Sequence, residues 1–459
     1  MRDEHVDVVS IPPPTANGPL HVGHLSGPYL AADFAARAAR LRGERVLAMA
    51  GVDVHQNYVL TRAELDGVDV DKMVDGYRDD IVEAFRRARI GYDAFIDPRA
   101  PGYGPAMASM VAQLVDGGAL PMRERELHRC ARCARTLHHS YVEGTCPACG
   151  HEACGGGCEG CGGFTSAQNM RAVRCARCGG EPVPFTARIP VLALEKHRSA
   201  LEELWLRAEL PVDVRALIGT ALRGPLPEIP AAYPTDWGVE GTGPLAGLRI
   251  DVYVEVCLNF VRGVAQALEP EVGEDAAAFA RVWRRRVRGL WNFYGIDNAY
   301  FYAIMWPALL ATAGVHLDQL SGMSVVNRFF TLDGFKFSTS RNHAVWANEF
   351  LAGEDPAIVR LFLAWNRPDR MGSDFTKSSF DAFAAHVRPL LAGSSQPVSS
   401  QPVSSLPAEL LDAERDRGER ALHYHDFDAP LAARALLSLL AAGSADSAGL
   451  RSVLTGELL

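Results

Sequence analysis

The sequence feature that most constrains the fold is a strand–turn–helix unit at the start of the chain. Residues 6–11, Val-Asp-Val-Val-Ser-Ile, are typical of a short buried strand. A proline-rich turn over 12–24 follows, and the alanine-rich residues 29–41 predict a helix with Gly43 as its C-cap. Because parallel α/β sheets bind ligands beyond a strand's carboxyl end and at a helix N-terminus, the sequence predicts an anion site here.

The turn reads Pro-Pro-Pro-Thr-Ala-Asn-Gly-Pro-Leu-His-Val-Gly-His, so His21 and His24 lie one helical turn apart. Two imidazoles in that position can donate hydrogen bonds to one phosphate chain, beside the free N–H groups of the helix end. Gly23 between them leaves the backbone open to a flat ring such as a purine. We therefore interpret this segment as a nucleotide site; the alternative is a capped helix with surface histidines.

Composition narrows the class of protein. The chain has 459 residues, 48% of them apolar, which suffices for two or three domains with a sizeable core. No apolar run reaches the roughly 18–20 residues of a membrane span, and the charged first residues do not form a signal peptide. We therefore expect a cytoplasmic protein with no membrane partner.

The net charge of −9 argues against a broadly basic binder of DNA. A tRNA partner would need a local basic surface. One group of arginines is either such a patch or an ordinary solvated helix face: Arg281, Arg284, Arg285, Arg286 and Arg288.

Lysine is rare in this chain, and one of the few lysines lies just after an Asp-Gly turn. Of 46 basic residues, the lysines are Lys72, Lys196, Lys336 and Lys377. Lys336 follows a predicted strand over 324–330 and an Asp-Gly turn, and it precedes Phe-Ser-Thr-Ser. A glycine-tipped loop with an ammonium and hydroxyl groups can close on a triphosphate. An ordinary serine-rich surface loop is the alternative.

Between these two segments we expect further elements of a sheet and its helices. Residues 45–50 and 248–256 predict strands; 71–89, 105–115, 191–230, 281–291 and 298–310 predict helices, the last kinked at Pro307. Asp53 lies just after the strand over 45–50, on the ligand side of such a sheet. A helix-capping aspartate is the alternative for that position.

Four Cys-x-x-Cys pairs lie between residues 130 and 178, which indicates tetrahedral zinc and not disulfides. Eight thiolates suit two ions, and four thiolates close a coordination shell, so we expect both zincs to be structural. The pairs could combine in sequence order or nest one within the other. The glycine-rich knuckles have little core of their own and need metal to hold their shape.

Together these segments resemble the class I aminoacyl-tRNA synthetases of the methionyl type. His21-Val22-Gly23-His24 resembles their first signature, and Lys336-Phe337-Ser338-Thr339-Ser340 their second, Lys-Met-Ser-Lys-Ser, with Thr339 in place of the second lysine. Gly-Thr-Cys-Pro-Ala-Cys-Gly and Cys-Glu-Gly-Cys-Gly between them resemble the family's zinc insertion. The resemblance, over residues 5–385, implies an α/β fold: a Rossmann-like (HUP-type) parallel sheet split by a zinc-binding insertion, with a short α-helical C-terminal region.

The resemblance also implies a reaction and its residues. It implies ATP with Mg²⁺, an amino acid as substrate, and an aminoacyl-adenylate intermediate. His21, His24 and Lys336 would be catalytic, and the ATP-binding residues would be Asn17, Gly18, His21, Gly23, His24, Lys336, Ser338 and Ser340. It favours nested zinc sites, formed by Cys146, Cys149, Cys158 and Cys161 and by Cys130, Cys133, Cys175 and Cys178.

The implied domains are two catalytic halves (1–117 and 233–350) around an insertion (118–232), followed by a helical junction (351–393). Residues 394–407 form a twice-repeated Ser-Ser-Gln-Pro-Val linker. A tail over 408–459 with helices at 409–424 and 429–442 is shorter than the family's anticodon-binding bundle. The acceptor is therefore either the acceptor end of tRNA or a small molecule; a paralogue without catalytic activity is the third possibility.

The implied amino-acid pocket departs from the methionine pattern. Its residues are Pro13, Thr15, Asp53, Glu255, Asn298 and Tyr302. The resemblance puts Asp53 beside the α-amino group; Thr15 replaces an aromatic residue, Glu255 a tryptophan, and Asn298 and Tyr302 an aliphatic residue and a histidine. An unpaired buried carboxylate disfavours a thioether. We therefore expect a substrate other than methionine, or a polar relative of it.

Overall fold

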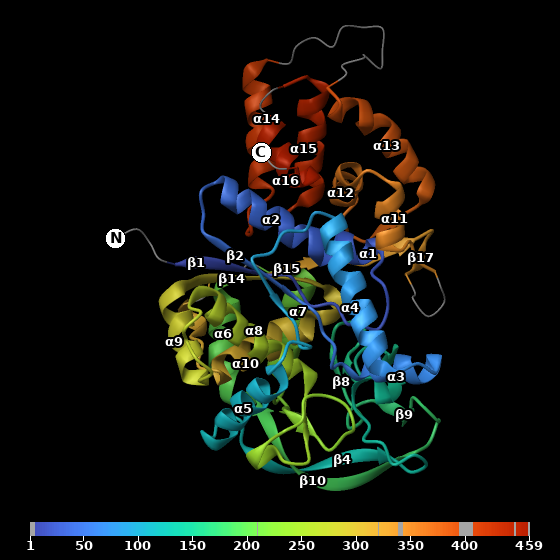
Figure 1. The fold of residues 1–459 in the computed structure, drawn as a ribbon, viewed down its shortest axis with the longest axis vertical. Coiled ribbons are helices and arrows are strands. Elements are labelled where there is room, and N and C mark those ends of the chain that lie inside the picture. The colour runs from blue at the N-terminus through green and yellow to red at the C-terminus, as the bar shows by residue number, and fades with distance from the viewer. Residues whose placement is uncertain are drawn as a thin grey trace.

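The computed structural model describes residues 5–208, 210–319, 321–337, 343–393, 407–444 and 447–457. At its centre lies a parallel sheet of five strands (Figure 1). In spatial order they are β15 (Ser321–Asn327), β14 (Val287–Gly295), β1 (Val6–Ser10), β2 (Val46–Gly51) and β3 (Ala94–Ile96). The Rossmann-like sheet is thus confirmed. Its order reverses between β1 and β14, the place where such sheets bind ligands.

The strand β14 replaces part of a predicted helix. The prediction of a helix over 281–291 is correct for 281–286 and wrong for 287–291, because helix α9 spans Ala276–Arg286 and β14 begins at Val287 without an intervening turn. Seven of the nine β14 residues are buried, and the strand pairs on both sides with β1 and β15. A short apolar run of this kind fits a central strand or a buried helix equally well by periodicity.

The strand predicted over 248–256 is also wrong. The short strand β13 (Arg249–Ile250) ends at Asp251, and helix α8 runs over Val252–Leu268. The Asp251 carboxylate accepts a hydrogen bond from the backbone N–H of Tyr253 at 3.0 Å, which caps the helix N-terminus. Valines at every second position of 252–256 imitate a strand, but α8 is buried on most of its faces.

Two apolar cores cover the two faces of the sheet. Val9 of β1 belongs to the core that contains α2 (Leu30–Leu41), and Val8 to the core that contains α8 and α9. This alternation is that of a strand buried on both faces. The expected elements at 45–50, 29–41, 71–89 and 105–115 correspond to β2, α2, α4 (Val70–Arg87) and α5 (Tyr103–Asp116).

The insertion begins with a long antiparallel ribbon of β4 (Met122–Cys130) and β10 (Pro182–Ala193), at the bottom of Figure 1. The cysteine knuckles lie between these two strands in the sequence. Helices α6 (Arg198–Arg207) and α7 (Val212–Arg223) close the insertion, as expected for 191–230. The helix expected over 298–310 is a π-helical turn at Phe301–Met305 that continues as α10 (Trp306–Thr312).

The C-terminal part is helical and packs against the sheet domain. The junction contains α11 (Ala347–Gly353), α12 (Pro356–Trp365) and α13 (Lys377–Leu391). The tail contains α14 (Ala408–Arg420), α15 (Ala429–Ala441) and a third helix that the sequence did not predict, α16 (Ala448–Thr455). Helix α15 contacts α12, and α16 contacts α2 and α12 (Figure 1). Most of the predicted linker, residues 394–406, lies outside the described residues.

One buried ion pair joins the tail to the core. Arg360 of α12 and Asp33 of α2 are both fully buried, with the guanidinium 2.7 Å from the carboxylate. The same guanidinium donates to the backbone carbonyls of Val453 and Leu454 at the end of α16. A cation at this position satisfies carbonyls that the helix end leaves without partners.

Four of the five arginines around α9 contact acidic side chains, and Arg284 contacts His316. Arg281 pairs with Asp275, Arg285 with Glu269, and Arg288 with Asp7. These pairs favour the interpretation of a solvated helix face. Across the described ranges of the chain, no helix combines the length and apolar character that a membrane crossing requires.

Candidate active site

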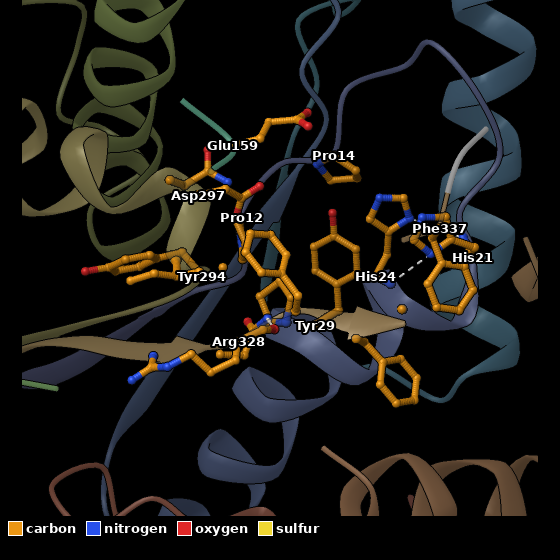
Figure 2. A pocket seen from close by; sticks show the side chains of 18 of the residues that line it. Pro12, Pro14, His21, His24, Tyr29, Glu159, Tyr294, Asp297, Arg328 and Phe337 are labelled. Atoms are coloured by element: carbon orange, nitrogen blue, oxygen red, sulfur yellow. Dashed lines mark hydrogen bonds between the residues drawn. The ribbon is translucent and has the colours of Figure 1, made fainter. Parts of the chain in front are cut away.

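A cavity of about 420 Å³ lies over the carboxyl ends of β1, β14 and β15 (Figure 2). The turn after β1 supplies Pro12–Thr15 and the first helix supplies His21–Tyr29, while residues 294–298 end β14 and 327–330 follow β15. Lys336 and Phe337 line it from the second signature segment. Segments more than 300 residues apart in the sequence therefore meet in one cleft, at the switch point of the sheet.

His21 and His24 cap each other at the N-terminus of α1 (Val22–His24). The Nδ1 of His21 accepts the backbone N–H of His24 at 3.3 Å, and the Nδ1 of His24 accepts the backbone N–H of His21 at 3.2 Å. The rings stack with centroids 3.7 Å apart. Because each Nδ1 acts as acceptor, the proton of each neutral ring is on Nε2, which leaves two N–H donors for a ligand.

These histidines are neutral near pH 7. Burial, and then the neighbouring His24, lower the pKa of His21 to about 2, and burial lowers the pKa of His24 to about 4. They therefore offer hydrogen bonds and not positive charge. Phe337 stacks on His21 at 4.5 Å, and a Cβ at Gly23 would lie 3.0 Å from the His21 ring and 3.2 Å from Phe337. A side chain at position 23 would therefore push against both rings.

Two cationic side chains line the first cavity, Lys336 and Arg328, and Arg328 is paired with Asp213. Lys336 lies on β17 (Phe335–Lys336), and its ammonium contacts the carboxylate of Glu159, which comes from the tip of a cysteine knuckle. Both side chains line the cavity. The predicted ATP-binding residues Ser338 and Ser340 lie outside the described residues.

A second cavity of about 230 Å³ shares several lining residues with the first, and the shared set is Pro13, Thr15, Glu159, Asp297, Asn298 and Tyr302. Asp53 lines only the second cavity. Its Oδ1 accepts the backbone N–H groups of His55 and Gln56 at 3.1 and 3.0 Å, and the Thr15 hydroxyl lies 3.3 Å from Oδ2. Burial, and then the charge of Glu255, raise the pKa of Asp53 to about 6.

Glu255 lies behind this cavity and does not line it. Its Oε1 is 2.7 Å from the Nδ1 of His55 and accepts the Tyr103 hydroxyl at 2.8 Å. Burial alone would lower the pKa of His55, but the charge and the hydrogen bond of Glu255 outweigh burial and raise it. Helix α8 instead presents Val252, Tyr253 and Val256 to the cavity. Tyr253 therefore lines the cavity where the sequence predicted Glu255. The change follows from the secondary structure, because this segment is a helix and not the expected strand.

Most of the predicted residues that the structure describes lie at the two cavities. The structure brings together at the two cavities Pro13, Thr15, His21, Gly23, His24, Asp53, Asn298, Tyr302 and Lys336. Asn17 and Gly18 line neither cavity; the backbone of this turn instead pairs with the strand end at Asp53, where Ala16 donates to the Asp53 carbonyl at 2.8 Å. The sequence interpretation missed Glu159, Tyr253 and Asp297. The sequence signal that could have identified Glu159 is its position between the two cysteines of a knuckle, Cys158 and Cys161.

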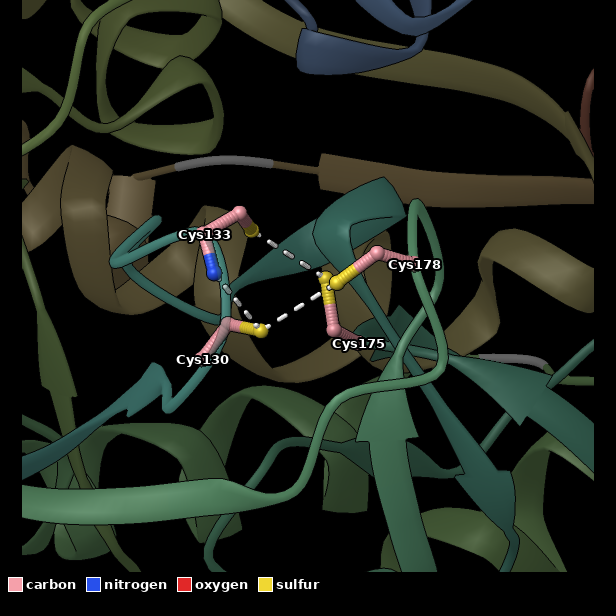
Figure 3. A group of neighbouring side chains, drawn as sticks. All are labelled: Cys130, Cys133, Cys175 and Cys178. Carbon is pink, nitrogen blue, oxygen red and sulfur yellow. Dashed lines mark hydrogen bonds between the residues drawn. The ribbon is translucent and has the colours of Figure 1, made fainter.

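The knuckle sulfurs form two groups in the nested arrangement. In one group the Cys130–Cys178 and Cys133–Cys175 sulfur distances are 3.4 and 3.8 Å (Figure 3). In the other, the Cys146–Cys161 and Cys149–Cys158 distances are 3.9 and 3.6 Å. Tetrahedral zinc with Zn–S bonds of about 2.3 Å requires sulfurs about 3.8 Å apart. Both groups therefore fit a structural zinc ion.

Comparison with known proteins agrees with this geometry. The profile of the family described as tRNA synthetases class I (M) matches residues 7–387. This chain belongs to that family. Proteins named methionine–tRNA ligase from Thermomicrobium roseum and Methanopyrus kandleri are each 30% identical, over 80% and 79% of this chain. The chain spans only 63% and 54% of the lengths of those two relatives.

The fold of this class I synthetase-family protein also has solved counterparts. A crystal structure of Mycobacterium tuberculosis methionyl-tRNA synthetase bound by methionyl-adenylate matches with a TM-score of 0.69 and 19% identity, and the match covers 98% of this chain and 88% of that one. A second structure of the same enzyme with methionyl-adenylate gives a TM-score of 0.67 and 18% identity. The fold is therefore shared over almost the whole chain, including the tail helices.

Proposed function

We propose that this protein activates an amino acid with ATP to form an aminoacyl-adenylate and then transfers the acyl group to an acceptor. The observation that carries the proposal is that His21, His24 and Lys336 line one cavity, which adjoins the cavity of Asp53. The proposed nucleotide site and the proposed site for the ammonium group thus share lining residues. Membership of the synthetase family and its ATP- and Mg²⁺-dependent chemistry support the same reaction.

In the first step the amino acid's carboxylate attacks the α-phosphorus of ATP, and the bond to pyrophosphate breaks in line with it. The two Nε2–H groups of His21 and His24 donate to phosphate oxygens beside the N-terminus of α1. The Lys336 ammonium offsets the charge that develops on the α-phosphate and the leaving pyrophosphate, and Asp53 holds the α-ammonium of the substrate. Position and electrostatics supply most of the rate in such a reaction.

The amino acid in this proposal has a polar side chain. The cavity next to Asp53 is lined by four residues that carry polar groups, Thr15, Tyr253, Asn298 and Tyr302, beside the apolar Val252, Val256 and Phe301. An apolar thioether would leave such groups without hydrogen bonds, and a buried polar group without a partner is costly. Glu255 does not contribute to this polar lining, because it lies behind the cavity.

The acceptor is either tRNA or a small molecule. The proteins that this chain matches in sequence carry the name of a tRNA ligase, which favours tRNA. Arg281, Arg285 and Arg288 are paired with acidic side chains, which reduces the positive charge that this surface offers to a phosphate backbone and favours a small molecule.

ATP–pyrophosphate exchange with a panel of amino acids tests the proposal. We expect exchange that depends on one polar amino acid and falls at least 100-fold in Lys336→Ala, with Lys377→Ala as a matched control. Exchange without tRNA and no label on tRNA would select the small-molecule acceptor. Exchange that is strongest with methionine would contradict the polar pocket, and no exchange with any amino acid would contradict the function.

A further inference from the structure

The carboxylate of Glu159 occupies a position that the proposed reaction leaves without a role. It lines both the nucleotide cavity and the adjoining amino-acid cavity, near Asp297 (Figure 2). Its neighbours Cys158 and Cys161 belong to the same four-sulfur group, so the knuckle that carries Glu159 is fixed at both ends. The insertion therefore presents one carboxylate, at a defined place, to the junction of the two cavities.

The charged residues that line the second cavity are all acidic. Its ionisable acids are Asp53, Glu159 and Asp297, and no lysine, arginine or histidine is among its described lining residues. Asp53 is matched in the proposed function by the α-ammonium of the amino acid. A second carboxylate, Glu159, therefore faces the substrates without a cationic counterpart in that cavity.

The present partner of Glu159 is Lys336, and both side chains are about half exposed or more, at 63% and 51%. In the proposed reaction the Lys336 ammonium moves from Glu159 to the phosphates of ATP. When its ammonium turns to the triphosphate, Glu159 is left beside an anionic ligand, which is unfavourable at short range. Another cation must then approach Glu159 if the loaded cleft is to be stable.

We propose that Glu159 binds a cationic group of a substrate, an ammonium or guanidinium, at the junction of the two cavities. This inference rests on the proposed adenylate-forming function and names the chemistry of one of its substrates. The cation can come from the side chain of the activated amino acid or from the acceptor. Lys336 pairs with Glu159 before ATP binds, and nucleotide binding then frees the Glu159 carboxylate for the substrate cation.

The first arm of the test compares charged amino acids with neutral ones of similar length. ATP–pyrophosphate exchange is measured with lysine, ornithine and arginine, and with norleucine, methionine and citrulline. If the side chain supplies the cation, wild type prefers the charged member of each pair, and Glu159→Gln reduces that preference about tenfold, the usual scale for one hydrogen bond to a charged group.

The second arm examines the acceptor. AMP release is measured with the amino acid that gives the most exchange, in the presence of ethanolamine or putrescine, which are cationic, or hydroxylamine, which is uncharged at pH 7.5. If the acceptor supplies the cation, Glu159→Gln lowers only the amine-stimulated rates, about tenfold. Glu152→Gln is the matched control, because Glu152 is exposed in the same insertion and lines neither cavity.

Three results would overturn the inference: no preference for cations in either arm, preferences that survive in Glu159→Gln, or a Mg²⁺ requirement that rises equally for every amino acid in that variant. The last result would assign Glu159 to the metal carried by ATP. The absence of exchange with every amino acid would instead overturn the proposed function on which the inference rests.

Discussion

Replacement of Arg360 by methionine should detach the C-terminal helix α16 from the catalytic domain. The guanidinium donates to Asp33, to the carbonyls of Ala88 and Arg89, and to those of Val453 and Leu454 at the end of α16. Methionine keeps most of the side-chain volume and removes every one of these donors. The variant therefore tests the charge and its hydrogen bonds, and hardly changes packing.

The expected loss of stability depends on the partners that Asp33 keeps in the variant. Breaking a buried ion pair by removal of one partner costs about 3–5 kcal/mol. Asp33 keeps a second partner in Arg37, at 2.9 Å, so the lower end of about 3 kcal/mol applies. If that loss falls on the docking of α16, protection of its amides against hydrogen exchange should decrease by about 100-fold.

Hydrogen–deuterium exchange of the peptide over 448–455 measures this directly. Arg370→Met is the matched control, because Arg370 is 85% exposed and lies 3.4 Å from its partner Asp428. Exposed pairs contribute about 0–1 kcal/mol, so protection should change there by less than about fivefold. Protection in Arg360→Met that stays within threefold of wild type would refute the idea that the buried charge holds the tail.

Three further predictions concern the cleft and the knuckles. Burial and the charge of Glu255 raise the pKa of Asp53 to about 6, so the ionised carboxylate that binds the substrate ammonium is lost as pH falls through that value. The KM for the amino acid should therefore rise about tenfold between pH 7 and pH 5. A KM that does not change over this range would contradict the role of Asp53. Over the same range kcat should not fall on account of His21 and His24, whose lowered pKa values keep them neutral, as a kcat–pH profile can check. Metal analysis should find two zinc ions per chain, with one lost in Cys158→Ser and the other in Cys178→Ser, while Cys154→Ser, which lies in neither sulfur group, keeps both.

The local parts of the site were predictable from the sequence, because short segments with strong physical signals determine them. The strand–turn–helix unit with His21 and His24, and Asp53 after β2, are of this kind. The knuckle pairs are another, since Cys-x-x-Cys spacing fixes the local turn. The nested grouping of the sulfurs required the resemblance to a family, because spacing alone allowed either pairing.

The errors arose where an apolar run fits two structures. Helix α9 continues into β14 without a turn residue, and α8 begins with alternating valines, so β14 and α8 were assigned the wrong type. The second error changed the assignment of the pocket, since on a helix Tyr253 and Val256 face the cavity and Glu255 turns behind it. Only tertiary packing distinguishes these alternatives.

The reciprocal capping of His21 and His24 has a consequence for mutational analysis of the signature. Each ring accepts a backbone N–H of the other residue, so a substitution leaves that hydrogen bond of the surviving ring intact but removes the ring on which it stacks, 3.7 Å away. Effects of single substitutions at these positions should therefore not add in the double variant. The stacked rings form one structural unit that presents two N–H donors, so the pair, and not either ring alone, is the part of the signature that mutagenesis would probe.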